Sequence, residues 1–142
     1  MIYTKKTKLA MKIAYEAHKG QMDKCGVPYI FHPVHLAEQM TDEKTTCVAL
    51  LHDVVEDTPI TFEEISEYGF DEDIIGALRL LTRDLYVPYM DYVAKIKENP
   101  IARKVKLADL RHNSDLSRLD GVDERALQRN EKYKAAIKLL EE

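Results

Sequence analysis

Six consecutive residues in the first half of the chain combine side chains that bind metal ions with side chains that accept protons. The run begins with His52 and Asp53 and ends with Glu56 and Asp57. In an α-helix, residues four apart share a face, so His52 would lie over Glu56 and Asp53 over Asp57. The almost wholly apolar stretch 46–51 predicts a buried helix that carries this cluster at its C-terminal end. Carboxylates there oppose the helix dipole, and a divalent cation would supply the missing positive charge.

Two residues that are distant in sequence could complete a metal site. His32 is predicted to lie on a turn that enters a helix, because the following Pro33 disfavours helical geometry in the residue before it. Asp109 lies in a predicted helix among apolar residues, where a carboxylate is costly to bury unless it is paired or binds a cation. Two nitrogen and two oxygen ligands suit Mn²⁺, Fe²⁺ or Zn²⁺ better than Ca²⁺. The predicted metal ligands are His32, His52, Asp53 and Asp109.

Taken alone, each of these residues has an ordinary structural explanation. A histidine before proline, such as His32, is often a loop or cap residue, and a lone helical aspartate, such as Asp109, often caps a helix or pairs with a nearby Lys or Arg. His18 and His35 are weak candidates for metal ligands. His112, three residues after Asp109, is better placed to contact that metal ligand than to bind the metal itself. The six-residue run is harder to explain, because a solvated charge run does not normally follow six apolar residues in one helix.

Length and composition predict one globular domain over residues 1–142, with 45% hydrophobic and 32% charged residues. The net charge of −4 argues against a nucleic-acid partner. No apolar run approaches the roughly 20 residues that cross a bilayer, and no secretory signal is visible. We therefore expect a cytoplasmic protein without a membrane partner, and the sequence does not indicate its oligomeric state. Cys25 and Cys47 are predicted to be free thiols, in a loop and in the core respectively.

Apolar residues recur at helical spacing along nearly the whole chain, which predicts an all-α bundle of about seven or eight helices. Thr61 and Glu64 match a capping box, Asp71 can cap the next helix, and Pro88 can open another. Only the segment 26–31 has a strand-like pattern, and it is too short and isolated to build a sheet. The expected helical segments are 9–17, 33–40, 46–57, 61–69, 71–81, 88–96, 102–116 and 123–140.

Four segments carry histidine, aspartate and glycine motifs in a recognisable order: 14–21 (AYEAHKGQ), 28–33 (PYIFHP), 49–58 (ALLHDVVEDT) and 106–113 (KLADLRHN). Their order and spacing resemble the hydrolase domain of RelA/SpoT homologues, within the HD phosphohydrolase superfamily, over roughly residues 5–120. The resemblance implies an HD-domain helical bundle that removes the 3′-diphosphate of guanosine tetra- or pentaphosphate, the (p)ppGpp alarmones. Because no synthetase domain follows, a small stand-alone alarmone hydrolase is expected, similar in architecture to the metazoan SpoT homologues.

The same resemblance implies roles for individual residues. Glu56 and Asp57 would assist the attacking water, and Asn113 would contact the nucleotide sugar or its phosphate. Among basic residues near the motifs, Lys24 is the nearest candidate for contact with substrate phosphates, and Arg111 is a weaker one. The implied metal is Mn²⁺, and its implied ligands are His32, His52, Asp53 and Asp109.

The loop after the first segment departs from the family. Asp23 stands where relatives usually have an arginine that packs against the base, so stacking by a guanidinium is expected to be lost there. Val27 replaces a Glu or Thr, and Leu116 replaces a hydroxyl residue that often contacts the nucleotide. Two other classes of function therefore remain open. One is an HD phosphohydrolase that acts on another nucleotide, and the other is a non-catalytic HD domain that senses a nucleotide.

Overall fold

A computed structural model of the protein describes residues 1–142 as helices joined by loops, without a sheet. The all-α prediction is confirmed. The segment with a strand-like pattern forms only an isolated bridge between Met22 and Pro28. No helix combines the length and the apolar composition that crossing a bilayer requires. The elements are α1 (Lys5–Ala17), α2 (Phe31–Glu38), α3 (Glu43–Leu51), α4 (Val54–Asp57), α5 (Phe62–Glu67), α6 (Glu72–Leu81), α7 (Tyr89–Lys97), α8 (Pro100–Asn113), the 3₁₀ helix η1 (Leu116–Arg118) and α9 (Glu124–Glu141).

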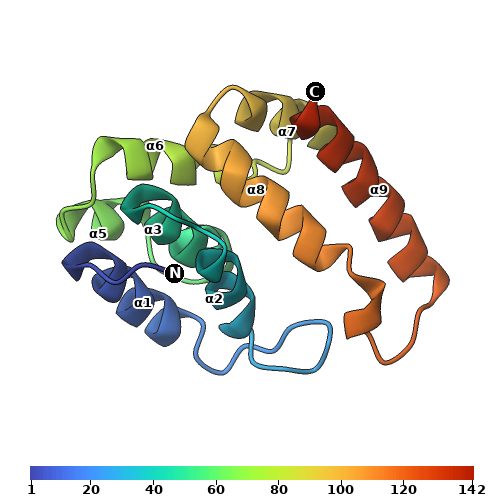
Figure 1. The fold of residues 1–142 in the computed structure, drawn as a ribbon, viewed down its shortest axis with the longest axis horizontal. Coiled ribbons are helices and arrows are strands. Elements are labelled where there is room, and N and C mark those ends of the chain that lie inside the picture. The colour runs from blue at the N-terminus through green and yellow to red at the C-terminus, as the bar shows by residue number, and fades with distance from the viewer.

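Helix α3 is the centre of the bundle, with α1, α2, α6 and α8 packed around it (Figure 1). The helix begins after Asp42, whose carboxylate accepts a hydrogen bond from the backbone N–H of Thr45 at 2.8 Å. Every residue from Thr45 to Leu51 is buried. Because this part of α3 is enclosed by other helices, the residue that follows its end, His52, lies in the interior of the protein.

The helix predicted over 46–57 is broken, which is why the fold has nine α-helices where we expected at most eight. Helix α3 ends at Leu51, and α4 starts at Val54 after a turn made by His52 and Asp53. In a continuous helix the N–H of Asp53 would bond to the carbonyl of Ala49. Nδ1 of the His52 ring instead lies 2.7 Å from that carbonyl oxygen. The break separates the buried imidazole from the carboxylates that follow it.

His32 lies inside a helix, contrary to the expectation that Pro33 keeps it out of one. Helix α2 begins at Phe31, so both residues belong to its first turn. Proline is tolerated there because the N–H groups of the first turn have no partner within the helix. The side chain of His32 is buried and is held by a helix that packs directly on α3.

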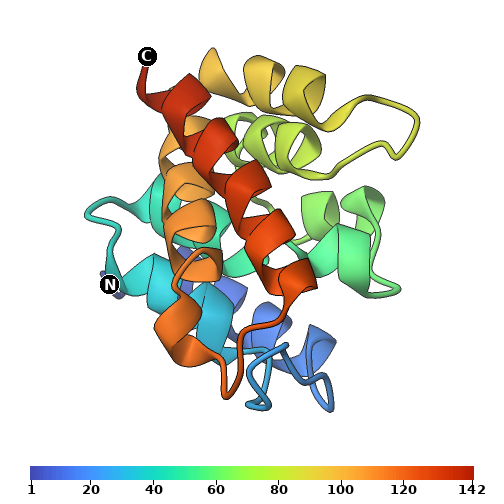
Figure 2. The ribbon, with the colours of Figure 1, turned by 90° about the vertical axis from the view of Figure 1, so that its right-hand side faces the viewer.

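The caps predicted from the sequence are partly confirmed. Thr61 accepts a hydrogen bond from the N–H of Glu64 at 3.2 Å, and Asp123 accepts one from the N–H of Ala126 at 2.8 Å, so α5 and α9 begin where expected. Asp71 precedes α6 without a side-chain cap, because its carboxylate pairs with Lys6. Helix α9 crosses α8 and α7 on the outside of the bundle (Figure 2).

Leu50→Ala is expected to lower the free energy of unfolding by about 2–5 kcal/mol, because the side chain is fully buried in α3 and its removal leaves a cavity. Urea denaturation followed by circular dichroism measures this loss. Leu127→Ala, at a residue of α9 that is 51% exposed, is the control and should change stability by no more than about 0.5 kcal/mol. Equal losses in the two variants would contradict the central place of α3.

Candidate metal centre and pocket

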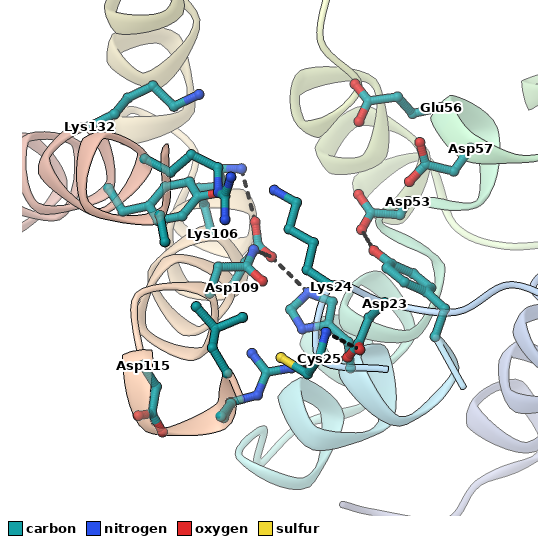
Figure 3. A pocket seen from close by; sticks show the side chains of 18 of the residues that line it. Asp23, Lys24, Cys25, Asp53, Glu56, Asp57, Lys106, Asp109, Asp115 and Lys132 are labelled. Atoms are coloured by element: carbon teal, nitrogen blue, oxygen red, sulfur yellow. Dashed lines mark hydrogen bonds and ion pairs between the residues drawn. The ribbon is translucent and has the colours of Figure 1, made fainter. Parts of the chain in front are cut away.

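A cavity of about 500 Å³ opens between α4, α8, α9, η1 and the loop that joins α1 to α2 (Figure 3). Seven of the eight predicted site residues line it, and the eighth, His52, lies buried behind Asp53. The structure thus brings together residues from the first, second and last thirds of the chain. The predicted residues that line the cavity are Lys24, His32, Asp53, Glu56, Asp57, Asp109 and Asn113.

Three of the four predicted metal ligands form one buried group. Their potential ligand atoms all lie within 4.8 Å of one another. Nε2 of His32 is 2.8 Å from Oδ1 of Asp109, and Nε2 of His52 is 3.7 Å from the same oxygen. Two imidazole nitrogens and a carboxylate oxygen that converge in this way are a donor set for a divalent transition metal.

The His52 ring provides the clearest sign that this group fits a cation. The contact between its Nδ1 and the carbonyl of Ala49 makes Nδ1 the protonated nitrogen, which leaves the lone pair on Nε2. Nε2 is buried and makes no hydrogen bond, although Oδ2 of Asp53 lies 3.0 Å from it. A buried polar atom without a hydrogen-bond partner calls for an explanation. A metal ion coordinated by Nε2 satisfies it.

His112 supports His32 from behind. The Nδ1 atoms of the two rings are 2.7 Å apart, so one ring must donate to the other. Burial, together with the neighbouring His32, lowers the pKa of His112 to about 4. A neutral His112 can accept a hydrogen bond from the Nδ1–H of His32. Nε2 of His32 then faces Asp109 with its lone pair free. His35 stacks on the other face of His112 at 4.1 Å and takes no part in the ligand group.

Asp109 pairs with a nearby lysine and also faces the predicted metal ligands, the two roles that its sequence context allowed. Oδ1 faces the histidines and accepts a hydrogen bond from Asn113 at 2.9 Å, while Oδ2 binds Nζ of Lys106 at 2.9 Å. Burial alone would raise the pKa of Asp109, but the charge of Lys106 holds it well below its usual range. The carboxylate is therefore ionised and fixed in orientation.

A second acidic group borders the first. The carboxylates of Asp53, Glu56 and Asp57 also have ligand atoms within 4.8 Å of one another, and Asp53 accepts a hydrogen bond from the hydroxyl of Tyr29. Oε1 of Glu56 accepts a hydrogen bond from the backbone N–H of Arg83 at 2.9 Å. Burial raises the pKa of Glu56 and of Asp57, and the charge of Asp53 adds to both shifts. Asp53 thus touches both groups, and its neighbours are improved proton acceptors.

Two basic residues singled out in the sequence have different surroundings. Lys24 points into the cavity from the loop before α2 (Figure 3). Arg111 lies outside the cavity, is 57% exposed and pairs with Glu141 at 2.8 Å, so its proposed contact with substrate is wrong. Leu116 lines the main cavity, whereas Val27 lines a smaller cavity beside it.

Asp23 organises the loop around it instead of projecting a free charge into the pocket. Its Oδ1 accepts hydrogen bonds from the N–H groups of Cys25 at 2.7 Å and Val27 at 3.3 Å. Its Oδ2 accepts one from Arg118 of η1 at 3.2 Å, and Arg118 also donates to the carbonyl of His112 at 2.8 Å. Because Arg118 lines the cavity, a guanidinium is present in this part of the pocket after all, supplied by a different element.

Sequence reasoning overlooked several residues that line the pocket. One of them had a visible signal, because Lys106 stands three residues before Asp109 and so shares its helix face. Two others stand three residues apart on α9, although nothing in the sequence places α9 against the motifs. The residues overlooked are Tyr29, Arg83, Lys106, Arg118, Arg129 and Lys132.

Asp23→Ala and Arg118→Ala should each destabilise the protein by about 1–3 kcal/mol, because each leaves a charged partner that is largely buried without its counterion. Their side chains are only 10% and 21% exposed. The double variant should lose less than the sum, with a coupling of roughly 0.5–3 kcal/mol in urea denaturation. The exposed pair Lys44 and Asp73 is the matched control and should couple by no more than about 1 kcal/mol. Additive losses for Asp23 and Arg118 would show that the contact does not hold the loop.

Comparison with known proteins extends these observations. A family model described as HD domain matches residues 10–111. The guanosine-3′,5′-bis(diphosphate) 3′-pyrophosphohydrolase of Aquifex aeolicus is 35% identical over 141 residues, which cover 91% of this chain and 19% of the relative. The bifunctional (p)ppGpp synthase/hydrolase SpoT of Escherichia coli K12 is 45% identical over 67 residues, 44% of this chain and 10% of the relative. This chain therefore spans only a small fraction of the length of these curated relatives.

A solved structure matches nearly the whole chain, with a TM-score of 0.76 and 26% sequence identity over 99% of this chain and 88% of the other. That protein is described as a metazoan ortholog of SpoT that hydrolyses ppGpp and plays a role in starvation responses. The matches confirm the resemblance to the hydrolase domain of RelA/SpoT homologues. By its motifs, its fold and its relatives, this chain belongs to the HD domain family.

Proposed function

We propose that this protein is a metal-dependent pyrophosphohydrolase that removes the 3′-diphosphate of guanosine tetra- or pentaphosphate. The observation that carries the proposal is the buried group of His32, His52 and Asp109, which borders the acidic group of Glu56 and Asp57 in one pocket. The names of the relatives, which specify this reaction, support the choice of substrate.

The proposed ligands are His32, His52, Asp53 and Asp109, and the proposed ion is Mn²⁺. Imidazole and carboxylate donors also suit Fe²⁺ and Zn²⁺, so the choice of Mn²⁺ rests on the resemblance to the family. When bound, the ion would acidify water and offset the negative charge of the diphosphate. Among the four, Asp53 stands between the two groups, because it contacts His52 and also belongs to the acidic group.

In the proposed reaction, Glu56 takes the proton of the attacking water. Its Oε1 is held by the N–H of Arg83, which leaves Oε2 to accept the proton. The water oxygen bonds to the phosphorus that is attached to the 3′ oxygen. The bond between that phosphorus and the 3′ oxygen breaks. The 3′ oxygen takes up a proton, so the products are guanosine 5′-diphosphate and pyrophosphate when the substrate is the tetraphosphate. Asp57, also raised in pKa, orients the water or shares its proton.

Two residues position the nucleotide in this proposal. The amide of Asn113 lines the pocket and already donates to Asp109, so its remaining polar atoms face the sugar or its phosphate. Lys24 offers a primary ammonium to a substrate phosphate from the opposite loop. A non-catalytic sensor would not need carboxylates with raised pKa values beside its metal ligands, which favours the enzyme over the sensor.

Asp109→Asn should lose most of the bound metal while the fold survives, because the amide keeps the size of the side chain but removes the charge that faces the two imidazoles. Elemental analysis of the purified variant, loaded with Mn²⁺ and dialysed, measures the loss. His35→Ala is the control and should retain about one ion per chain, as the wild type should. Full occupancy in Asp109→Asn would remove Asp109 from the ligand set.

Glu56→Gln should retain metal and bind guanosine tetraphosphate, but its turnover should fall by a factor on the order of 10² or more, the usual scale for a positioned proton acceptor. Single-turnover assays of pyrophosphate release with metal-loaded protein measure this. Glu67→Gln, at an exposed residue of α5 away from the pocket, is the matched control and should react at the wild-type rate. A wild-type rate for Glu56→Gln would transfer the role to Asp57.

A further inference from the structure

One motif of the sequence has no part in the reaction proposed above. The segment 14–21 contains His18 and Gln21, whose side chains lie outside the cavity. Tyr29, which follows in the loop between α1 and α2, lines the cavity but has no role in that reaction. Contacts of these three side chains lead to the two ends of α4, the single-turn helix that carries the proposed proton acceptors.

Tyr29 holds the carboxylate that precedes α4. Its hydroxyl donates a hydrogen bond to Oδ2 of Asp53, drawn as the dashed line at Asp53 in Figure 3. The same oxygen lies 3.0 Å from Nε2 of His52. The ring of Tyr29 packs against two imidazoles, with its centre 4.8 Å from that of His18 and 5.7 Å from that of His32. The ring is thus confined, and its hydroxyl fixes the rotation of the carboxylate.

Gln21 holds the other end of α4. Its Nε2 donates a hydrogen bond to the backbone carbonyl of Asp57 at 2.9 Å. Because a carbonyl can only accept, Oε1 of Gln21 is the atom that faces His18, where it accepts a hydrogen bond from Nδ1 at 2.8 Å. The backbone carbonyl of Gln21 also accepts a hydrogen bond from the N–H of Tyr29 at 2.9 Å. The two residues that hold α4 are therefore bonded to each other.

Helix α4 depends on such contacts because it has only four residues. A helix of that length is not stable by itself, and the carbonyls of its last turn have no partner within the helix. Val54 is its only buried residue, so the apolar core secures α4 at one position. Tyr29 and Gln21 supply further attachments, one before the first residue of the turn and one at its last.

Ordinary packing explains where the rings lie but not where their polar atoms point. Four tyrosines line the cavity, and Tyr29 is the only one whose hydroxyl bonds to a metal ligand or to the acidic group. The hydroxyl of Tyr92 donates instead to the backbone carbonyl of Leu81 at 2.7 Å. A hydrogen bond to a ligating carboxylate orients that ligand, and its loss typically weakens metal binding or activity 10- to 100-fold.

We propose that Tyr29 and Gln21 are positioning residues for the hydrolysis. Tyr29 orients Asp53 as a metal ligand. Gln21 fixes the last residue of α4, so that Glu56 and Asp57 stay directed at the metal ligands. This inference rests on the proposed function and deepens it. The two residues act at different ends of α4, and their loss causes different defects, one in metal affinity and one in the rigidity of the turn.

The affinity for Mn²⁺ tests the role of Tyr29 without any turnover. Titration of the protein with Mn²⁺, followed by the electron paramagnetic resonance signal of the free ion, measures the dissociation constant. Tyr29→Phe keeps the ring and should raise this constant about tenfold or more. Tyr92→Phe is the matched control, because it removes a hydroxyl that bonds only to a backbone carbonyl, and should bind Mn²⁺ as the wild type does.

Hydrogen exchange tests the role of Gln21. Gln21→Met keeps the length of the side chain but removes the donor, so the N–H groups of Asp57 and Thr58, which bond within the turn, should exchange about fivefold faster. Its dissociation constant for Mn²⁺ should equal that of the wild type. Gln39→Ala is the matched control, because Gln39 also donates to a backbone carbonyl, that of His35 at 3.3 Å, and should leave the exchange in α4 unchanged.

The inference is overturned if Tyr29→Phe binds Mn²⁺ as tightly as the wild type, or if the exchange in α4 is the same in Gln21→Met and the wild type. Equal losses of Mn²⁺ affinity in Tyr29→Phe and Tyr92→Phe would also overturn it, because the hydroxyl of Tyr29 would then act only through stability. Failure of the proposed function gives a different result. If both variants respond as expected but the wild type does not hydrolyse guanosine tetraphosphate, the proposed function fails and the positioning roles stand.

Discussion

The ionised carboxylate of Asp109, buried at the middle of the bundle, is the group on which the arrangement of the site depends. A charge in that position is costly unless cations or hydrogen-bond donors surround it. Lys106 satisfies one oxygen, and Asn113 and the imidazole of His32 approach the other. Nε2 of His52 lies close by without a hydrogen bond. A divalent ion would complete a set of contacts that the protein alone leaves incomplete.

The surrounding helices serve this requirement. Helix α3 is buried from Thr45 to its end at Leu51, where His52 enters the interior, and α2 holds His32 against it. The break before α4 then turns Glu56 and Asp57 toward the cavity, away from the buried imidazoles. One kink thus separates metal ligands from proton acceptors while keeping them a few ångströms apart. A continuous helix would have stacked Glu56 on His52.

The sequence was sufficient to predict the all-α class, the acidic cluster within residues 52–57 and seven side chains that line one pocket. These succeed because helical periodicity, caps and motif spacing are local or semi-local signals. The kink at His52 was not predictable from the same signals, because a side-chain contact with the carbonyl of Ala49 replaces a backbone bond there. Arg118 and α9 were missed for a different reason, since their contact with the pocket depends on how distant helices pack. The ion pair between Asp23 and Arg118 was not predictable, because the two residues lie 95 residues apart in the chain.

In the proposed reaction, water attacks phosphorus in this pocket and a whole diphosphate leaves from the 3′ side. Hydrolysis of guanosine tetraphosphate by Mn²⁺-loaded protein in ¹⁸O-enriched water, with mass spectrometry of both products, tests this claim most directly. We expect pyrophosphate that carries one ¹⁸O atom and guanosine 5′-diphosphate that carries none. Release of single phosphate, label on the nucleoside, or absence of any product would contradict it.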